Sequence, residues 1–335
     1  MKTLRIWFAC SLGLAISILL DWDLGFLAIL LPLFVLGISD KINVSLLAII
    51  MISAVFTTTV ASVIWEVFKH YPVVLFLLVG ILFLSYCIAM TNKKTFIIGY
   101  MGLIVGSIIL NLSSYPFMDV EELCITVWAY SLSNIFICAL AYYLFPEPVK
   151  VDIEDLDETD ESSYVAKQVM MVWFVVMAAL FVFQFADLYD SVAAHASILV
   201  ILIPMTCSGA IQMAKVRIIG TTLGCLAGLI IHLVLGLWLE NAFLYWLLFT
   251  IAMGPFCYWQ TQGVVKSALS TSAMAALTVP LTTALIPGER DAFYAILYRF
   301  SSIFIAVLLS AICIFLIQKT LEHHALKKTV KVSEI

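Results

Sequence analysis

Long apolar segments separated by short polar ones make up most of this sequence, and they constrain its fold more than any other feature. A helix needs about 17–25 apolar residues to cross a bilayer, and most of the segments are near that length. Hydrophobic residues form 64% of the 335 residues and charged residues 12%, with a mean hydropathy of +1.11, whereas soluble domains are about 45–50% apolar. The sequence therefore predicts an all-α polytopic membrane protein with about twelve transmembrane helices, at residues 5–20, 24–38, 44–64, 71–90, 95–111, 122–145, 165–184, 192–210, 217–238, 242–258, 265–286 and 292–317.

The first two apolar segments differ from the others. Segment 5–20 resembles a signal peptide, but no small-x-small cleavage site precedes Asp21, so we expect a membrane anchor. Segment 24–38 is short and contains Pro32 and Gly37. We expect it to be either a broken helix or one that crosses only half of the bilayer.

An acidic segment divides the chain into two parts. It begins near Pro146 and combines a block of acidic residues with few large apolar ones, which is typical of a solvated linker. The last residues are polar and basic. We therefore predict a first six-helix half at 1–146, a cytoplasmic linker at 147–164, a second six-helix half at 165–318 and a cytoplasmic tail at 319–335.

The two halves repeat one another in sequence. Ile29-Leu30-Leu31-Pro32, followed by Gly37, recurs as Ile201-Leu202-Ile203-Pro204, followed by Gly209. Lys94 and Lys266 are separated by the same number of residues as these two segments. In addition, Ser133-Asn-Ile-Phe-Ile137 recurs as Ser301-Ser-Ile-Phe-Ile305. A half with an even number of spans keeps its orientation when it is repeated. The sequence thus predicts two parallel halves, related by an axis along the membrane normal, with a pathway on that axis.

The distribution of positive charge predicts the orientation. With a cytoplasmic N-terminus, fourteen of the 17 lysines and arginines fall in cytoplasmic segments and only Lys69 and Arg290 outside. Arg299 alone falls within a predicted span. Because cytoplasmic loops carry an excess of positive charge, we expect both termini to be cytoplasmic, in the inner membrane of a bacterium.

A motif opens the third span of the second half. Arg217-Ile-Ile-Gly220-Thr221-Thr-Leu-Gly224 follows Lys215, and Gly228 continues the glycines at four-residue spacing. Glycines so spaced fall on one helix face and let a second backbone approach closely, so we predict a packing surface there. Lys215 and Arg217 should lie at the cytoplasmic edge of the helix. They either only follow the excess of positive charge on that side or form an electropositive entrance that attracts anions.

This motif resembles the signature of the fusaric acid resistance and aromatic acid exporter family, and Tyr298-Arg299 matches another arginine common in that family. Plant aluminium-activated malate channels are more distantly similar. The chain lacks the large soluble domain of typical members and so resembles their short form. The resemblance implies efflux of small organic acids, aromatic or amphipathic, across a Gram-negative inner membrane. It also implies a periplasmic adaptor protein of the haemolysin-D type as a partner.

Arg299 is the first candidate for binding a substrate. An arginine near the middle of a bilayer costs at least about 2.5–3.5 kcal/mol on insertion scales, so it should face an anionic partner. The partner is either an outer-edge acid such as Asp187, Asp190 or Asp119, or the carboxylate of the substrate, which the guanidinium fork binds in bidentate fashion. We favour the substrate, because the first half has no arginine at the equivalent place.

Four further residues add polar or titratable groups to the second half. His195 and His232 lie in spans and could relay protons, although a single histidine in a helix more often serves packing. Gln260 and Gln262 lie at a predicted cytoplasmic turn and could line a pathway or bond between helices. No Asp or Glu lies deep in a predicted span, which argues against a carboxylate proton relay through the bilayer centre.

Absent motifs limit the function classes. The chain has no Walker motif, no H-E-x-x-H and no G-x-S-x-G, and its eight cysteines show no metal-binding spacing. We expect no cofactor, no enzymatic activity and no nucleic-acid partner, while a homo-oligomer is compatible with the sequence. The favoured function is an exporter of small organic acids. The alternatives are a passive organic-anion channel and a membrane-embedded enzyme that acts on a lipid-linked substrate.

Overall fold

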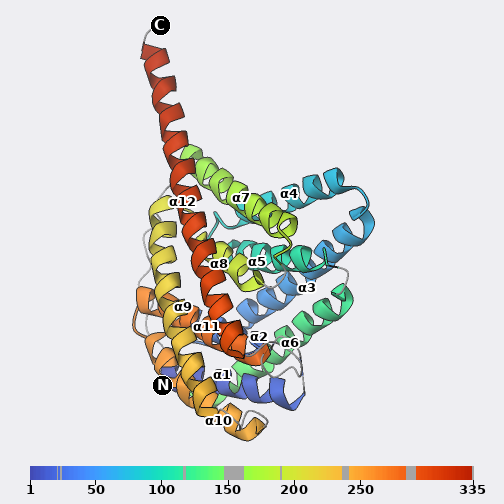
Figure 1. Cartoon of the computed structure of the whole chain (residues 1–335), viewed down its shortest axis with the longest axis vertical. Helices are drawn as coiled ribbons and strands as arrows, with labels where there is room; N and C mark the ends of the chain where they lie inside the picture. The colour runs from blue at the N-terminus through green and yellow to red at the C-terminus, as the bar shows by residue number, and fades with distance from the viewer. Residues whose placement is uncertain are drawn as a thin grey trace.

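The computed structural model describes residues 1–20, 22, 25–115, 118–146, 162–188, 191–235, 241–283 and 292–333. All regular secondary structure in these ranges is helical (Figure 1). The helices are α1 (Lys2–Leu19), α2 (Leu27–Ile38), α3 (Val44–Phe68), α4 (Pro72–Ala89), α5 (Phe96–Leu112), α6 (Val120–Leu144), α7 (Ser162–Phe185), α8 (Val192–Ile201), α9 (Cys207–Leu235), α10 (Ala242–Trp259), α11 (Val264–Thr283) and α12 (Ala292–Ser333).

The helices are those of a multi-pass membrane protein. Eight of them are long and apolar enough to cross a bilayer, namely α1, α3, α4, α6, α7, α9, α10 and α12, whereas α2, α5 and α8 are shorter apolar helices. Their outward faces carry many exposed aliphatic and aromatic side chains, which a lipid solvent would cover. The prediction of an all-α membrane protein is therefore confirmed.

Several helices begin at residues with the expected capping chemistry. Asn43 and Asn241 accept a hydrogen bond from the third backbone N–H of α3 and α10, and Asp119 caps α6 in the same way. Pro72 opens α4, where its missing N–H costs nothing. These caps satisfy N–H groups that have no partner within the helix, which explains why the helices begin at these residues.

The helix contacts of the first six helices recur among the last six. The pairs α3–α5, α3–α6, α2–α6 and α4–α5 have counterparts in α9–α11, α9–α12, α8–α12 and α10–α11. Contacts that join one set of six to the other recur as well: α1–α10 matches α7–α4, and α2–α11 matches α8–α5. The two main apolar cores each bury residues from both sets.

Individual side chains follow the same recurrence. The indole of Trp7 on α1 donates to the carbonyl of Thr250 on α10 at 2.6 Å, and that of Trp173 on α7 donates to the carbonyl of Gly80 on α4 at 2.8 Å. The two tryptophans thus tie the first helix of each set to the fourth helix of the other. The two tryptophans and their two acceptor residues are not separated by one constant shift along the chain. This correspondence was therefore not found in the sequence.

Two predicted boundaries, the end of α8 and the start of α9, were wrong. Segment 192–210 was expected to be one span, but α8 ends at Ile201 and the chain turns through Pro204 before α9 begins at Cys207. The last predicted span, 292–317, agrees with the candidate membrane span Ile296–Lys319, while helix α12 itself continues to Ser333 and projects beyond the other helices (Figure 1). The predicted linker falls almost wholly outside the described residues, at 147–161.

Candidate functional site

Arg217 does not lie at a water edge, as we predicted, but is buried inside the protein. It stands ten residues after the start of α9, and only 6% of it is exposed. The prediction failed because α9 begins at Cys207, so that residues assigned to the end of the preceding span and to the loop after it form its first turns. The neighbouring Lys215 is exposed.

The contacts of Arg217 are made by neutral groups. Its Nε and Nη2 both donate to the Oγ of Ser197 on α8, at 3.1 and 3.0 Å. The phenol of Tyr100 on α5 lies within electrostatic range. Over the part of the chain that the structure describes, Ser197 is its only hydrogen-bond partner. A buried charge without an opposite charge is costly, so this guanidinium is suited to binding an anion.

Thr221 adds a second hydroxyl one turn further along α9. It is 1% exposed, and its Oγ1 has no hydrogen-bond partner within the described ranges. Residues four apart on a helix lie on the same face, so Arg217 and Thr221 present a cation and a free hydroxyl side by side. An anion could accept hydrogen bonds from both.

The glycines of the motif form a neighbouring face with a different role. A Cβ at Gly220 would lie 2.7 Å from the carbonyl oxygen of Leu269, and one at Gly224 would collide with the carbonyl oxygen of Ala273. Both partners belong to α11, whose backbone therefore passes directly against α9. The predicted packing surface is confirmed. The motif thus contributes two neighbouring faces of α9. Arg217 and Thr221 form a polar stripe, and Gly220 and Gly224 form a glycine stripe that packs against α11.

Arg299 lies on α12, seven residues after its start, and is partly buried. Both Arg299 and Arg217 lie within electrostatic range of Cys225 on α9. Arg299 is not the only cation among the helices, as we had expected. Besides Arg217, Arg5 of α1 is fully buried, with its guanidinium 4.5 Å from the ring centroid of Tyr142.

None of the other candidates forms a hydrogen bond with Arg217 in the part of the chain that the structure describes. His195 on α8 bonds through Nε2 to Ser107 on α5 at 2.8 Å and stacks on Phe183 with the ring centroids 4.9 Å apart, which is a packing arrangement. His232 is partly buried in the last turn of α9. Gln260 is buried at the end of α10, where it accepts a hydrogen bond from Thr271, while Gln262 is exposed and accepts one from Lys266.

Ser197, Thr221 and Tyr100 were missed in the sequence. Thr221 stands within the motif, where its spacing of four from Arg217 was the available signal. Ser197 and Tyr100 come from other helices, and only the packing of α5, α8 and α9 brings them to the guanidinium.

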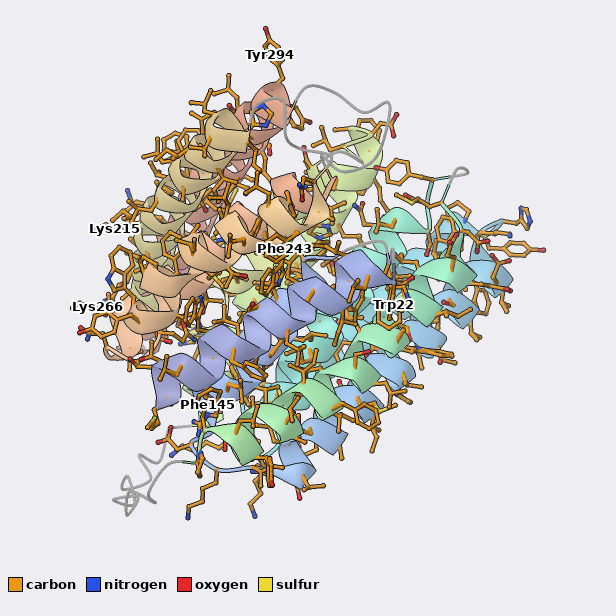
Figure 2. The ribbon with its side chains drawn as sticks, turned by 90° about the horizontal axis from the view of Figure 1, so that it is seen from below. Trp22, Phe145, Lys215, Phe243, Lys266 and Tyr294 are labelled. Atoms are coloured by element: carbon orange, nitrogen blue, oxygen red, sulfur yellow. The ribbon has the colours of Figure 1, made fainter. Side chains whose placement is uncertain are left out.

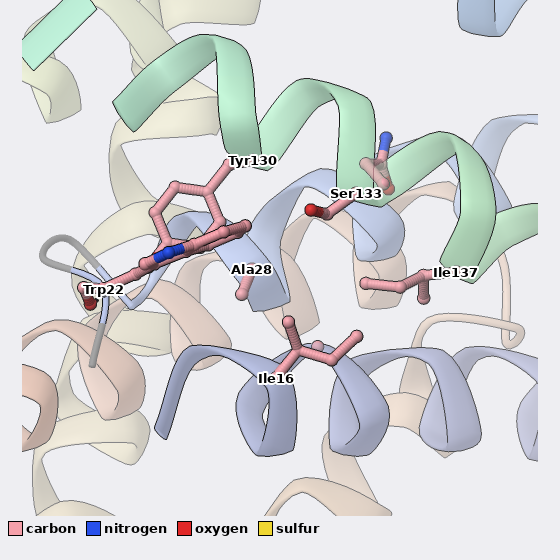
Figure 3. A pocket seen from close by; sticks show the side chains of 8 residues that line it. Ile16, Trp22, Ala28, Tyr130, Ser133 and Ile137 are labelled. Atoms are coloured by element: carbon pink, nitrogen blue, oxygen red, sulfur yellow. Dashed lines mark hydrogen bonds between the residues drawn. The ribbon is translucent and has the colours of Figure 1, made fainter. Parts of the chain in front are cut away.

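A cavity beside Tyr130 and a metal centre would be alternatives to the Arg217 site. A space bounded by α1, α2 and α6 lies beside Tyr130, Ser133 and Ala28 (Figure 3), but it is too small to hold a water molecule. Among the described residues, no group of three or more His, Cys, Asp or Glu side chains could hold a metal ion.

Comparison with known proteins gives one partial match. Residues 2–141 match the model of a family described as "Protein of unknown function (DUF2955)". This region runs from α1 into α6 and ends before Arg217. No curated protein and no solved structure matches the chain. The chain is therefore similar over its first six helices to a family without an assigned activity, and the likeness to aromatic acid exporters stays a prediction.

Proposed function

We propose that this protein is a transporter that exports small organic acids across a bacterial inner membrane, with Arg217 binding the carboxylate. The observation that carries this proposal is the burial of a guanidinium whose described hydrogen-bond partner is a neutral hydroxyl. A carboxylate would supply the missing charge and could accept two parallel hydrogen bonds from the guanidinium fork.

The surroundings of Tyr100 support an aromatic or amphipathic substrate. Its ring lies 6.1 Å from that of Phe34 on α2 and 6.0 Å from that of Phe96, measured between centroids. An aromatic cluster beside a cation can accommodate the apolar body of an organic acid while the cation binds its charged end.

The recurrence of helix contacts supports an arrangement of two parallel six-helix halves. The same pairs form within each set of six and between the sets, as two related halves around a common axis would produce. Arg217 on α9 lies near the contact of α5 with α8, which joins the two sets. We propose that the pathway runs between the halves at this contact.

We propose that both termini and the acidic linker are cytoplasmic. Figure 2 shows Lys215, Lys266 and Phe145 toward one end of the helices, and Trp22 and Tyr294 toward the other. Basic residues at the first end agree with a cytoplasmic side. In a variant whose eight native cysteines are replaced by serine, a cysteine introduced by Leu156→Cys should therefore resist a membrane-impermeant maleimide in intact cells and react after permeabilisation. Labelling in intact cells would reverse the orientation.

Counterflow in proteoliposomes tests transport itself. Purified protein reconstituted into vesicles loaded with benzoate should accumulate labelled benzoate from outside, with saturation. A channel would give flux without saturation or counterflow, and an enzyme that acts on lipid-linked substrates would give neither flux nor counterflow.

A haemolysin-D-type adaptor, which the exporter resemblance implies, would carry the substrate onward, and its co-purification with the chain tests that partner. Size-exclusion chromatography with light scattering would show whether the transporter is a homo-oligomer.

Arg299 provides a second prediction about binding. We propose that it attracts the substrate at the outer end of the pathway, so Arg299→Lys, which keeps the charge but loses the fork, should weaken benzoate binding several-fold and leave folding intact. Arg299→Ala should abolish counterflow. If neutralising Asp187 or Asp119 restores counterflow to Arg299→Ala, the arginine belongs to an ion pair and not to the pathway.

A further inference from the structure

Ser197 occupies the place that an anionic oxygen would take at Arg217. Its hydroxyl donates to the carbonyl of Ala193, one turn back on α8, at 2.6 Å. The proton of the hydroxyl is therefore used within α8, and Ser197 Oγ faces Arg217 as an acceptor only. It accepts from both Nε and Nη2, and these are two N–H donors that could otherwise bind the two oxygens of a carboxylate.

The helix that carries Ser197 is short and connected in an unusual way. α8 has ten residues, which is about 15 Å at 1.5 Å per residue. Asp187 precedes it with φ 54° and Met205 follows it with φ 53°, and these are the only non-glycine residues with positive φ in the described chain. Such values are uncommon outside glycine, and backbone of this kind is concentrated at switch regions.

The corresponding helix of the first half is connected differently. Phe26, before α2, has φ −61°, and Ser39, after it, has φ −111°, which are ordinary values. Pro32 lies inside α2, whereas Pro204 lies in the turn after α8. The two repeated prolines thus serve different local structures, and only α8 stands between two left-handed residues.

Resting on the proposed function, we propose that Ser197 is a placeholder for the anion and that α8 is the gate of the Arg217 site. In the described state Ser197 caps the guanidinium. Arrival of a carboxylate displaces Ser197 Oγ, and α8 moves away as a unit about Asp187 and Met205. The bond between His195 and Ser107 holds the other side of α8 to α5, so it must yield in the same movement.

Removing the placeholder tests this directly. In purified protein, Ser197→Ala should bind benzoate about tenfold more tightly by isothermal titration calorimetry, because the anion no longer competes with the hydroxyl. Ser131→Ala is the matched control: Ser131 is buried on α6 and donates to the carbonyl of its own helix, at Val127, as Ser197 does to Ala193. The control should bind benzoate as the unaltered protein does.

A second variant keeps the test decisive. Ser197→Asp supplies a permanent carboxylate to Arg217, so it should raise the melting temperature and abolish benzoate binding. If Ser197→Ala binds benzoate equally or more weakly while Arg217→Gln loses it, the placeholder is overturned and the anion site stands. If Arg217→Gln and both Ser197 variants all bind benzoate as the unaltered protein does, the proposed anion site fails together with the gate.

Discussion

Arg217→Gln should reduce benzoate binding and counterflow by about 100-fold or more, since the loss of one partner of a buried charge pair costs several kcal/mol and each 1.4 kcal/mol is tenfold. Arg217→Lys should reduce benzoate binding and counterflow by less than Arg217→Gln does, because lysine retains the charge but lacks the guanidinium fork. Calorimetry on purified protein and counterflow in proteoliposomes measure the two effects. Lys215→Gln, at an exposed position two residues earlier, is the control and should leave both nearly unchanged.

The thermal stability of Arg217→Gln distinguishes an anion-binding arginine from a structural one. Glutamine removes a buried charge that no described acid balances, and it can still bond to Ser197, so the melting temperature should stay the same or rise. A structural arginine would behave in the opposite way. A fall of several degrees on Arg217→Gln, with benzoate binding preserved, would place Arg217 in the scaffold and remove the main support for anion transport.

The overall fold could be read from the sequence because the bilayer imposes a simple rule. Backbone groups in lipid must be bonded within their own segment, so each apolar segment of sufficient length becomes a helix. Most helices of the described ranges fall close to the predicted segments, and the exceptions are the end of α8, the start of α9 and the extension of α12. Segment 24–38 was expected to be a broken or a half-crossing helix; α2 is continuous through Pro32 and ends at Ile38, the predicted last residue.

The site was less predictable because hydropathy does not place a boundary inside an apolar run. Segment 192–210 looks continuous, and Pro204 alone did not show on which side of it the turn ends. Ten helical residues before Arg217 were therefore missed, and a buried cation was taken for one at the membrane edge. The burial of Arg5 was not predicted either, because the ring that covers it, Tyr142, lies far along the chain.

The polar partners of Arg217 illustrate a second limit. Only tertiary packing bonds Ser197, on α8, to the guanidinium and brings Tyr100, on α5, within electrostatic range of it. Serine in a membrane helix commonly bonds to its own backbone, as Ser131 does, so nothing marks Ser197 in the sequence. The glycines were predictable, in contrast, because their four-residue spacing alone defines a face.

Gly224→Ala should destabilise the protein strongly, and Gly224→Leu should nearly abolish the folded yield. A Cβ at Gly224 would collide with the carbonyl oxygen of Ala273 and lie 2.8 Å from the Cβ of Ala276. Backbone cannot move aside as a flexible side chain can, so α9 and α11 would have to separate. Overpacking of a well-packed core costs about 1–3 kcal/mol, and we expect at least the upper end of that range here.

Gly254 is the matched control for this prediction. It lies on α10, and the nearest atom to its added Cβ would be Nε1 of Trp7 at 3.9 Å, an ordinary contact. Gly254→Ala should therefore keep the yield of monodisperse protein in fluorescence-detected size-exclusion chromatography, while Gly224→Ala should lower it severalfold. If Gly224→Ala instead expresses normally but changes which acids are exchanged, the glycine stripe lines the pathway, and the division of the motif into a binding stripe and a packing stripe is wrong.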